Sequence, residues 1–266
     1  MLRFRLMLDE STDVSITNTE IERCRAYLEY QHNHPKRPSA EGVWPPGGPA
    51  ITISPQTGAG AGEIAEKLAA LLQAEEPSNG PPWCVFNRQL VVHALEEHNL
   101  PARLAERMPE DRRSYFDDVV DEFMGLRPPS WEIVPLIVKS ILHLADAGHV
   151  ILVGRGAGVA TKGVRNVFHV RLVAALEKRI ERVQKREHLS PKDAEKLITK
   201  TDRGRDRFAR AYFHTDVDDD LNYHLVLNTD LVPMSDVVEL IAEGARRCFA
   251  TAQTAGNRVQ AIAGAM

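Results

Sequence analysis

The sequence has few cysteines and no long apolar run. Cys24, Cys84 and Cys248 are an odd number of cysteines without C-x-x-C spacing, which excludes a disulfide framework and a zinc ribbon. No apolar stretch approaches the roughly 20 residues that a membrane-spanning helix needs. Met1–Glu10 carries charges where a signal peptide has an apolar centre. We therefore expect a soluble, cytoplasmic protein with no membrane partner.

An excess of basic residues is also absent. The chain of 266 residues has 33 Lys and Arg against 37 Asp and Glu, which gives a net charge of −4. General binding to a nucleic-acid polymer or to an anionic membrane requires the opposite balance, and we expect neither. Hydrophobic residues make up 43% of the chain, which is enough for a packed core and excludes disorder throughout.

The basic residues are concentrated in one block. The segment from Arg165 to Arg210 holds 14 Lys and Arg and 7 Asp and Glu, a local net charge of +7. Such a block inside an acidic chain favours a local site for an anion such as phosphate. The alternative is a helix surface whose charges are simply solvated.

The pattern of apolar residues predicts strands that alternate with helices. Short β-prone runs predict strands at residues 50–54, 83–86, 150–153, 167–172 and 224–227. Helical periodicity predicts helices at 18–30, 63–73, 174–187, 190–213 and 235–249, with further helical segments between the second and third strands. This alternation indicates right-handed crossover units and a parallel sheet covered by helices.

Composition divides the chain into three parts. The run Pro45-Pro46-Gly47-Gly48-Pro49 predicts a stiff linker, so that residues 1–49 form an N-terminal extension. Residues 50–249 carry the α/β pattern and form the main domain. The Ala- and Gly-rich residues 250–266 have little to bury and are expected to be a flexible tail.

A glycine-rich loop, Gly58-Ala59-Gly60-Ala61-Gly62, separates the first predicted strand from the first helix of the domain. Glycines allow backbone N–H groups to converge, and the helix start adds partial positive charge, so such a loop can cradle a phosphate. The dinucleotide motif G-x-G-x-x-G fails, because Glu63 stands in the place of its third glycine. An Ala/Gly turn that packs a helix on a strand is an equally good explanation of the loop alone.

The mononucleotide P-loop, G-x-x-x-x-G-K-[ST], fits this loop in position but not in its letters. With Gly60 as the second glycine, Pro55 takes the place of the first. Ala61 takes the place of the lysine, and Gly62 that of the hydroxyl residue.

The loop is one of several segments that share a recognisable order and spacing. These segments are 51–54, 58–65, 86–90, 150–157, 166–183, 185–205 and 222–229. Together they resemble the cytidylate kinase-like family, a branch of the nucleoside monophosphate kinases, over roughly residues 50–244.

The resemblance implies a P-loop NTPase fold with three α/β/α layers and a five-stranded parallel sheet. It also implies a helical insertion at 87–147 that binds the nucleoside monophosphate, and a mobile helical lid at 187–220. The implied reaction transfers the γ-phosphoryl group of ATP to CMP or dCMP, so ATP and Mg2+ are the expected cofactors and nucleotides the expected substrates.

The resemblance further implies roles for individual residues. The ATP phosphates would contact Ser54, Thr57, Gly58, Ala59, Gly60, Ala61, Gly62 and Glu63. The acceptor would contact Asn87, Arg88, Arg155 and Arg210. The transferred phosphoryl group would be neutralised by Arg155, Arg203, Arg205 and Arg207, and no protein ligand for a metal is assigned.

The arginines of the lid do not all point the same way. At helical spacing Arg203, Arg207 and Arg210 share a face, while Arg205 points elsewhere. We expect Asp202 to orient an arginine rather than to bind a metal. Arg179 and Arg182 follow the fourth strand and are expected either to close the base of the lid or to pair at the surface.

The chain departs from the family pattern close to the phosphates. Pro55 and Gly62 occupy positions where the family has basic residues, Asn87 replaces an aspartate, and the loop has no lysine. Losing such a cation removes transition-state stabilisation on the order of several kcal/mol.

Two functions therefore stay open, with a third behind them. One is a kinase for CMP, dCMP or a related acceptor, and the other is a catalytically weak or inactive nucleotide-binding regulatory protein. Residues 1–49 could dock a protein partner in the second case. A kinase for a different small acceptor is the third.

Overall fold

A five-stranded parallel sheet lies at the centre of the computed structural model, which describes residues 18–34, 48–77, 80–87, 134–154 and 156–263. Its strands lie in the order β2-β3-β1-β4-β5, and every pairing is parallel. The strands are β1 (Ala50–Pro55), β2 (Cys84–Phe86), β3 (Val150–Val153), β4 (Val167–Val173) and β5 (Leu225–Asn228). The predicted α/β fold with a five-stranded parallel sheet is thus confirmed.

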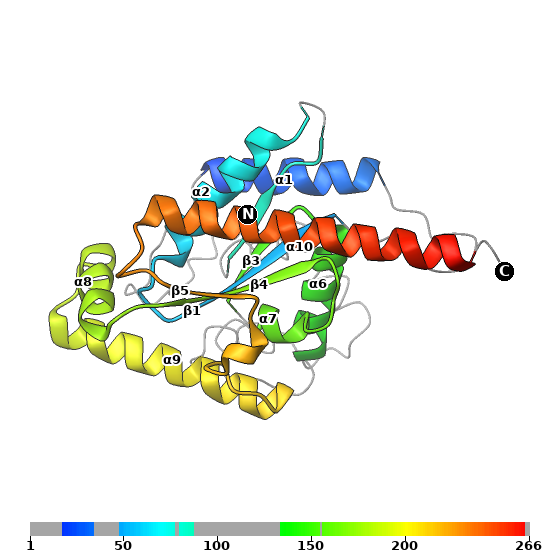
Figure 1. Ribbon diagram of the computed structural model, residues 1–266. Helices are drawn as coiled ribbons and strands as arrows, with labels where there is room; N and C mark the ends of the chain where they lie inside the picture. Colours follow the sequence, from blue (N-terminus) through cyan, green and yellow to red (C-terminus); the bar gives the residue numbers. More distant parts are fainter. Residues whose placement is uncertain (1–17, 35–47, 78–79, 88–133, 155, 264–266) are drawn as a thin grey trace, which may run out of the picture.

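Alternate residues of the strands serve two apolar cores, one on each face of the sheet. Ile51 and Ile53 of β1 point to the face covered by α2 (Ala61–Glu75) and α10 (Met234–Ala263). Ala50 of β1 joins the cluster on the other face, which includes α6 (Val134–Ala147) and α7 (Ala157–Ala160). Because both faces are buried, the strands read as nearly continuous apolar runs. Figure 1 shows the sheet between these helices.

Helix α1 (Asn18–Asn33) packs against the domain, although the sequence predicted a separate extension. Cys24 and Tyr27 are buried in the same cluster as Phe86 of the edge strand β2. The Tyr27 hydroxyl donates to the carbonyl oxygen of Gly148 (2.9 Å), and burial raises the pKa of Tyr27, so that this donor keeps its proton. The core of the domain therefore begins before residue 49. Docking of a protein partner through residues 1–49 stays a prediction.

Two helices form a hairpin beside the sheet (Figure 1). They are α8 (Leu176–Glu187) and α9 (Pro191–Phe213). Val183, Ala194 and Ile198 give the hairpin a small apolar core of its own. The side chain of Ser190 caps α9 by accepting from the N–H of Asp193 (3.2 Å). Helix α9 lies within the predicted lid and packs against α8, and it leads to the short helix η2 (Asp220–Asn222).

The end of the last helix differs from the predicted boundary, and most of the predicted insertion lies outside the described residues. Helix α10 continues to Ala263, past the predicted end at 249, and runs beyond the sheet towards the C-terminus (Figure 1). Of the predicted insertion at 87–147, only residue 87 and α6 lie within the described residues. In the described part of the chain, no helix combines the length and apolar character required to cross a membrane.

The packing of α1 generates a stability prediction. Tyr27→Ala removes a fully buried ring and its hydrogen bond, so we expect a loss of about 3–5 kcal/mol in the free energy of unfolding. Glu29→Ala, on the exposed side of the same helix, is the control and should change it by less than about 0.5 kcal/mol. Urea unfolding measures both. Equal effects of the two variants would mean that α1 is not part of the core.

Candidate functional site: the glycine loop and its arginines

The glycine loop turns the chain from β1 into α2 through two left-handed residues. Gly58 has φ +86° and Gly60 has φ +84°, a conformation that side chains disfavour. Gly60 is the residue before the helix, and no side chain caps it. Among the described residues, nothing accepts a hydrogen bond from the N–H groups of Ala61, Gly62 and Glu63. Three N–H donors at the positive end of a helix are thus available to an anion.

The carbonyl groups of the loop are held by four arginines. Each of these arginines donates from Nη1 to a different carbonyl oxygen: Arg171 to Ser54 (3.3 Å), Arg205 to Pro55 (2.7 Å), Arg179 to Thr57 (3.4 Å) and Arg182 to Gly58 (3.4 Å). In a trans peptide the N–H points opposite to the C=O. Among the peptides so held, the one after Ser54 has no N–H because Pro55 follows, and the N–H groups of Gln56 and Ala59 donate to the carbonyl oxygens of Leu172 (2.9 Å) and Gln56 (3.0 Å). The arginines therefore fix the path of residues 54–58 into α2.

The arginines come from three elements and create a strongly positive surrounding. Arg171 lies in β4 with only 7% of its side chain exposed, and its Nη2 contacts Asp218 (2.5 Å). Burial lowers the pKa of Arg205, Asp202 raises it, and the charges of Arg171, Arg186 and Arg179 lower it further. Arginine stays protonated despite such shifts. The loop is therefore bordered by positive charges, and a bound anion would reduce the repulsion between them.

Asp202 of α9 connects this helix to the loop. Its Oδ1 accepts from the backbone N–H of Thr57 (2.9 Å) and from the Thr57 hydroxyl (2.7 Å). Its Oδ2 accepts from Nη1 of Arg179 (2.6 Å), and Arg205 Nη1 lies 3.5 Å from Oδ1. The expectation that Asp202 orients an arginine agrees with this geometry. The carboxylate also occupies one N–H of the loop.

The donors around the loop suit phosphate rather than a metal ion. The Nε–H of Arg179 is buried and has no partner among the described residues, which leaves one more donor for an anion. Within the same residues there is no group of three or more His, Cys, Asp and Glu side chains that could hold a metal. Backbone N–H groups, a hydroxyl and guanidinium groups are the donors that bind phosphate in proteins.

The lid arginines that the sequence singled out are placed differently from one another. Arg205 contacts the loop, as described above. Arg203 and Arg207 line a hollow of about 420 Å3 along α9. Arg210 is exposed and pairs with Asp206 (2.8 Å) and Asp216 (2.8 Å). Arg205 thus lies on a different face of α9 from Arg203 and Arg207, in line with their helical spacing.

Other residues of the predicted site are placed as follows. Asn87 follows β2 directly. Arg88 and Arg155 lie outside the described residues. Gly154 (φ +75°) and Gly156 (φ +70°) both have a left-handed backbone conformation. The first of these glycines begins the turn after β3, and the second precedes α7.

Sequence reasoning missed Arg171. It lies between Val170 and Leu172, both buried in β4, and an arginine inside an otherwise apolar strand is a signal that it serves a specific contact. Arg179 and Arg182 were expected either to close the lid base or to pair at the surface. Both contact the loop, and Arg182 also donates to the Thr229 hydroxyl (2.9 Å).

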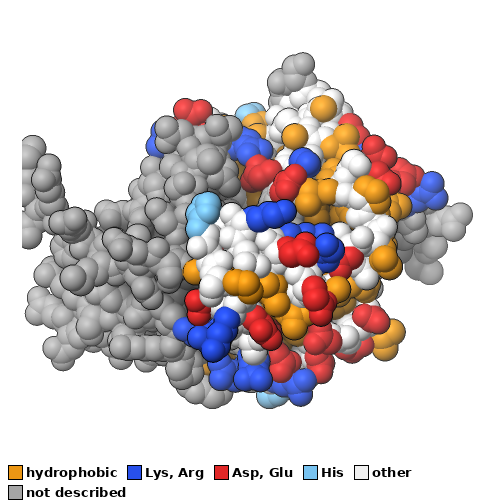
Figure 2. Space-filling model, turned by 90° about the vertical axis from the view of Figure 1, so that its left-hand side faces the viewer, with side chains coloured by type: hydrophobic (Ala, Val, Ile, Leu, Met, Phe, Trp, Pro, Cys, Tyr) orange, Lys and Arg blue, Asp and Glu red, His pale blue; other side chains and the backbone are white. Residues whose placement is uncertain are grey.

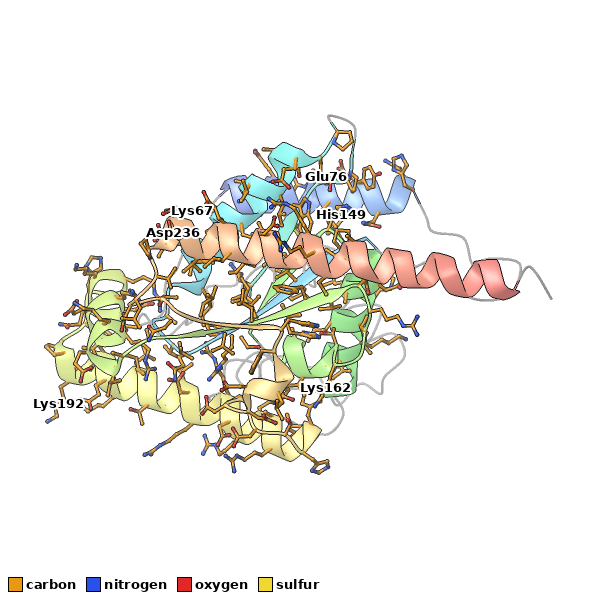
Figure 3. All side chains as sticks on the ribbon, viewed as in Figure 1. Lys67, Glu76, His149, Lys162, Lys192 and Asp236 are labelled. Atoms are coloured by element: carbon orange, nitrogen blue, oxygen red, sulfur yellow. The ribbon has the colours of Figure 1, made fainter. Side chains whose placement is uncertain are left out.

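Charge on this side of the molecule is mixed. On the face that carries α8 and α9, Lys and Arg side chains gather with Asp and Glu side chains among them (Figure 2). Lys67 does not replace the missing loop lysine, because it projects outward from α2 (Figure 3) and pairs with Glu63 (2.7 Å). The arginines are hence the cations nearest to the loop in the described part of the chain.

Gly58 and Gly62 provide a matched test of the loop geometry. A Cβ on Gly58 would lie 2.7 Å from the carbonyl oxygen of Arg179, whereas a Cβ on Gly62 would meet nothing within 4 Å. We expect Gly58→Ala to lower the free energy of unfolding by at least about 2 kcal/mol, from left-handed strain and this clash. Gly62→Ala, the control, should leave it equal or slightly higher. Urea unfolding that gave the same value for both would contradict the described loop.

Comparisons with known proteins agree with the fold and the loop. The family model described as "Cytidylate kinase-like family" matches residues 50–231. The crystal structure of an uncharacterized protein from Eubacterium ventriosum is 17% identical, with a TM-score of 0.51 over 74% of this chain and 98% of that chain. A shikimate kinase from Bacteroides thetaiotaomicron is 13% identical, with a TM-score of 0.40 over 75% of this chain and 95% of that chain, and supports no further conclusion.

One curated protein matches a shorter stretch. A uronate isomerase from Corynebacterium glutamicum is 32% identical over 105 residues, which are 40% of this chain and 20% of that protein. The chain therefore spans about a fifth of the length of this relative. The family match, by contrast, covers more than half of the chain and includes the loop, the arginines and Asp202. The chain belongs to the cytidylate kinase-like family.

Proposed function

We propose that the protein is a nucleotide kinase that transfers the γ-phosphoryl group of ATP to CMP, dCMP or a related acceptor. Membership of the family supports a nucleotide kinase in general. The observation that carries the proposal is the loop itself, whose three free N–H groups at the start of α2 and four arginine-held carbonyls form an anion site between a strand and a helix.

In this proposal, different groups of the chain have different roles in phosphoryl transfer. The N–H groups of Ala61, Gly62 and Glu63 would bind the phosphates of ATP, which places the triphosphate against the positive end of α2. Arg171, Arg179, Arg182 and Arg205 would act chiefly from behind the loop, fixing its carbonyls and adding positive potential. Mg2+, held by phosphate oxygens, would neutralise the charge that spreads over the transferred group.

The lid would complete the site from the other side. Arg203 and Arg207 line the hollow on α9 together with Lys196, Lys200 and Glu195, and four cations against one carboxylate favour a phosphorylated acceptor. Arg88 and Arg155 would contact the acceptor phosphate, as the resemblance implies.

A second candidate is a nucleotide-binding regulatory protein without catalysis. It is favoured by the absence of a lysine in the loop and by the pairing of Lys67 with Glu63, because no ammonium group then reaches the transferred phosphate. Both candidates require nucleotide binding at the loop, and only the first requires turnover.

An assay of ATP consumption across acceptors tests the proposal. We expect transfer to CMP or dCMP to exceed transfer to UMP and AMP, in the presence of Mg2+, and calorimetry to detect ATP binding. Binding without turnover for any acceptor, at high protein concentration, would reject the kinase in favour of the regulatory protein. Absence of ATP binding would reject both.

Gly62 offers a gain-of-function test of the missing cation. The position is exposed and open to a side chain, so Gly62→Lys adds an ammonium group beside the phosphates without a steric cost. We expect kcat to rise by about tenfold or more, because a cation placed at the transferring group stabilises the transition state. Gly62→Gln adds a neutral chain of similar length and is the control. Equal rates for the two variants would contradict the placement of phosphates at this loop.

A further inference from the structure

We infer that Asp202 holds the place of a phosphate oxygen at the loop, and that a triphosphate displaces it on binding. In the absence of ligand, the Asp202 carboxylate holds the lid against the loop. A bound triphosphate takes its place and frees the lid. The inference rests on the proposed function for the identity of the natural ligand, a nucleoside triphosphate. The anion site itself does not depend on the nucleoside.

The contacts of the Asp202 carboxylate are those of a bound oxyanion. It accepts from a backbone N–H and a hydroxyl of Thr57 and from the guanidinium of Arg179. In the described part of the chain it is the one carboxylate that accepts a hydrogen bond from a backbone N–H of the loop. N–H, O–H and guanidinium donors converging on one anion also make up a phosphate site.

The link joins segments that are far apart in the chain. Asp202 and Thr57 are separated by 145 residues, and α9 meets the loop through this carboxylate and through Arg205 on the Pro55 carbonyl. Thr57 is 7% exposed, while the Asp202 side chain is 30% exposed. The loop end of the contact is therefore buried and fixed, and the lid end is open to solvent and able to leave.

Charge repulsion favours the replacement of Asp202 by the triphosphate over the binding of both anions at once. Asp202 brings one negative charge to donors that a triphosphate also needs, and the two anions repel at short range in a partly buried site. When Asp202 leaves, the N–H and hydroxyl of Thr57 and the Nη1 of Arg179 become free for phosphate oxygens. The buried Nε–H of Arg179, which has no partner among the described residues, adds a donor that the carboxylate does not use.

Asp202→Asn tests the inference, with inorganic tripolyphosphate and ATP as separate probes. Asn keeps the size of the side chain but removes the competing charge, so tripolyphosphate and ATP should each bind about tenfold tighter than to the wild-type chain. Asp206→Asn removes the same charge one turn along α9, where the carboxylate pairs with the exposed Arg210. Its affinities should stay within about twofold of the wild type. Calorimetry gives the dissociation constants.

The outcomes separate this inference from the proposed function. Unchanged or weaker tripolyphosphate binding by Asp202→Asn overturns the inference, whatever ATP does, because Asp202 then supports the site instead of filling it. Tighter tripolyphosphate binding by Asp202→Asn, with no ATP binding by any variant, upholds the anion exchange and rejects the nucleotide kinase.

A measurement on the wild-type chain covers the case in which Asp202→Asn fails to fold. With side-chain carboxyl groups of aspartate labelled with 13C, tripolyphosphate should shift the signal of Asp202, because the carboxylate loses its hydrogen bonds. The signal of Asp206 should not move. An unmoved Asp202 signal at saturating tripolyphosphate would overturn the inference.

Discussion

The structure depends on how arginines hold the backbone of the glycine loop. Ser54, Pro55, Thr57 and Gly58 each present a carbonyl oxygen to a different guanidinium group. A loop with two left-handed glycines has many backbone conformations in isolation. Four charge-assisted hydrogen bonds select one of them, which carries the chain from β1 into the start of α2. Residues from β4, α8 and α9 thereby determine the shape of a loop that none of them belongs to.

This arrangement gives the arginines a different task from the one that the sequence suggested. Arginines near a phosphate loop are expected to contact phosphate directly. Arg205 instead donates from Nη1 to the carbonyl oxygen of Pro55. The cations act through the loop and through their combined potential. A fixed, preorganised loop lowers the cost of arranging donors around charge that develops during phosphoryl transfer. In the proposed kinase, the same arrangement would keep an anion site in a loop that has no lysine.

The sequence predicted the fold better than the site, for physical reasons. Strands such as β1 and β3 are buried on both faces, so their apolar runs are visible in the sequence, and the glycines mark the loop between β1 and α2. The contacts that matter most are not periodic. Asp202 meets Thr57 across 145 residues, and the role of Arg171 depends on which strand lies beside β1. Helix α1 was predicted, but its packing on β2 depends on the strand order, which local patterning does not contain.

The central claim is that the N–H groups at the start of α2 bind an anion, and that arginines hold the residues 54–58 that lead into this helix. Amide 1H–15N spectra of the full chain during titration with ATP test it most directly. The account predicts large shifts at Ala61, Gly62 and Glu63, and the loss of these shifts when Arg205 is replaced by Met, which keeps an unbranched apolar stem but cannot donate. ATP shifts that appear only elsewhere in the chain, or that stay at the loop unchanged in Arg205→Met, would contradict it.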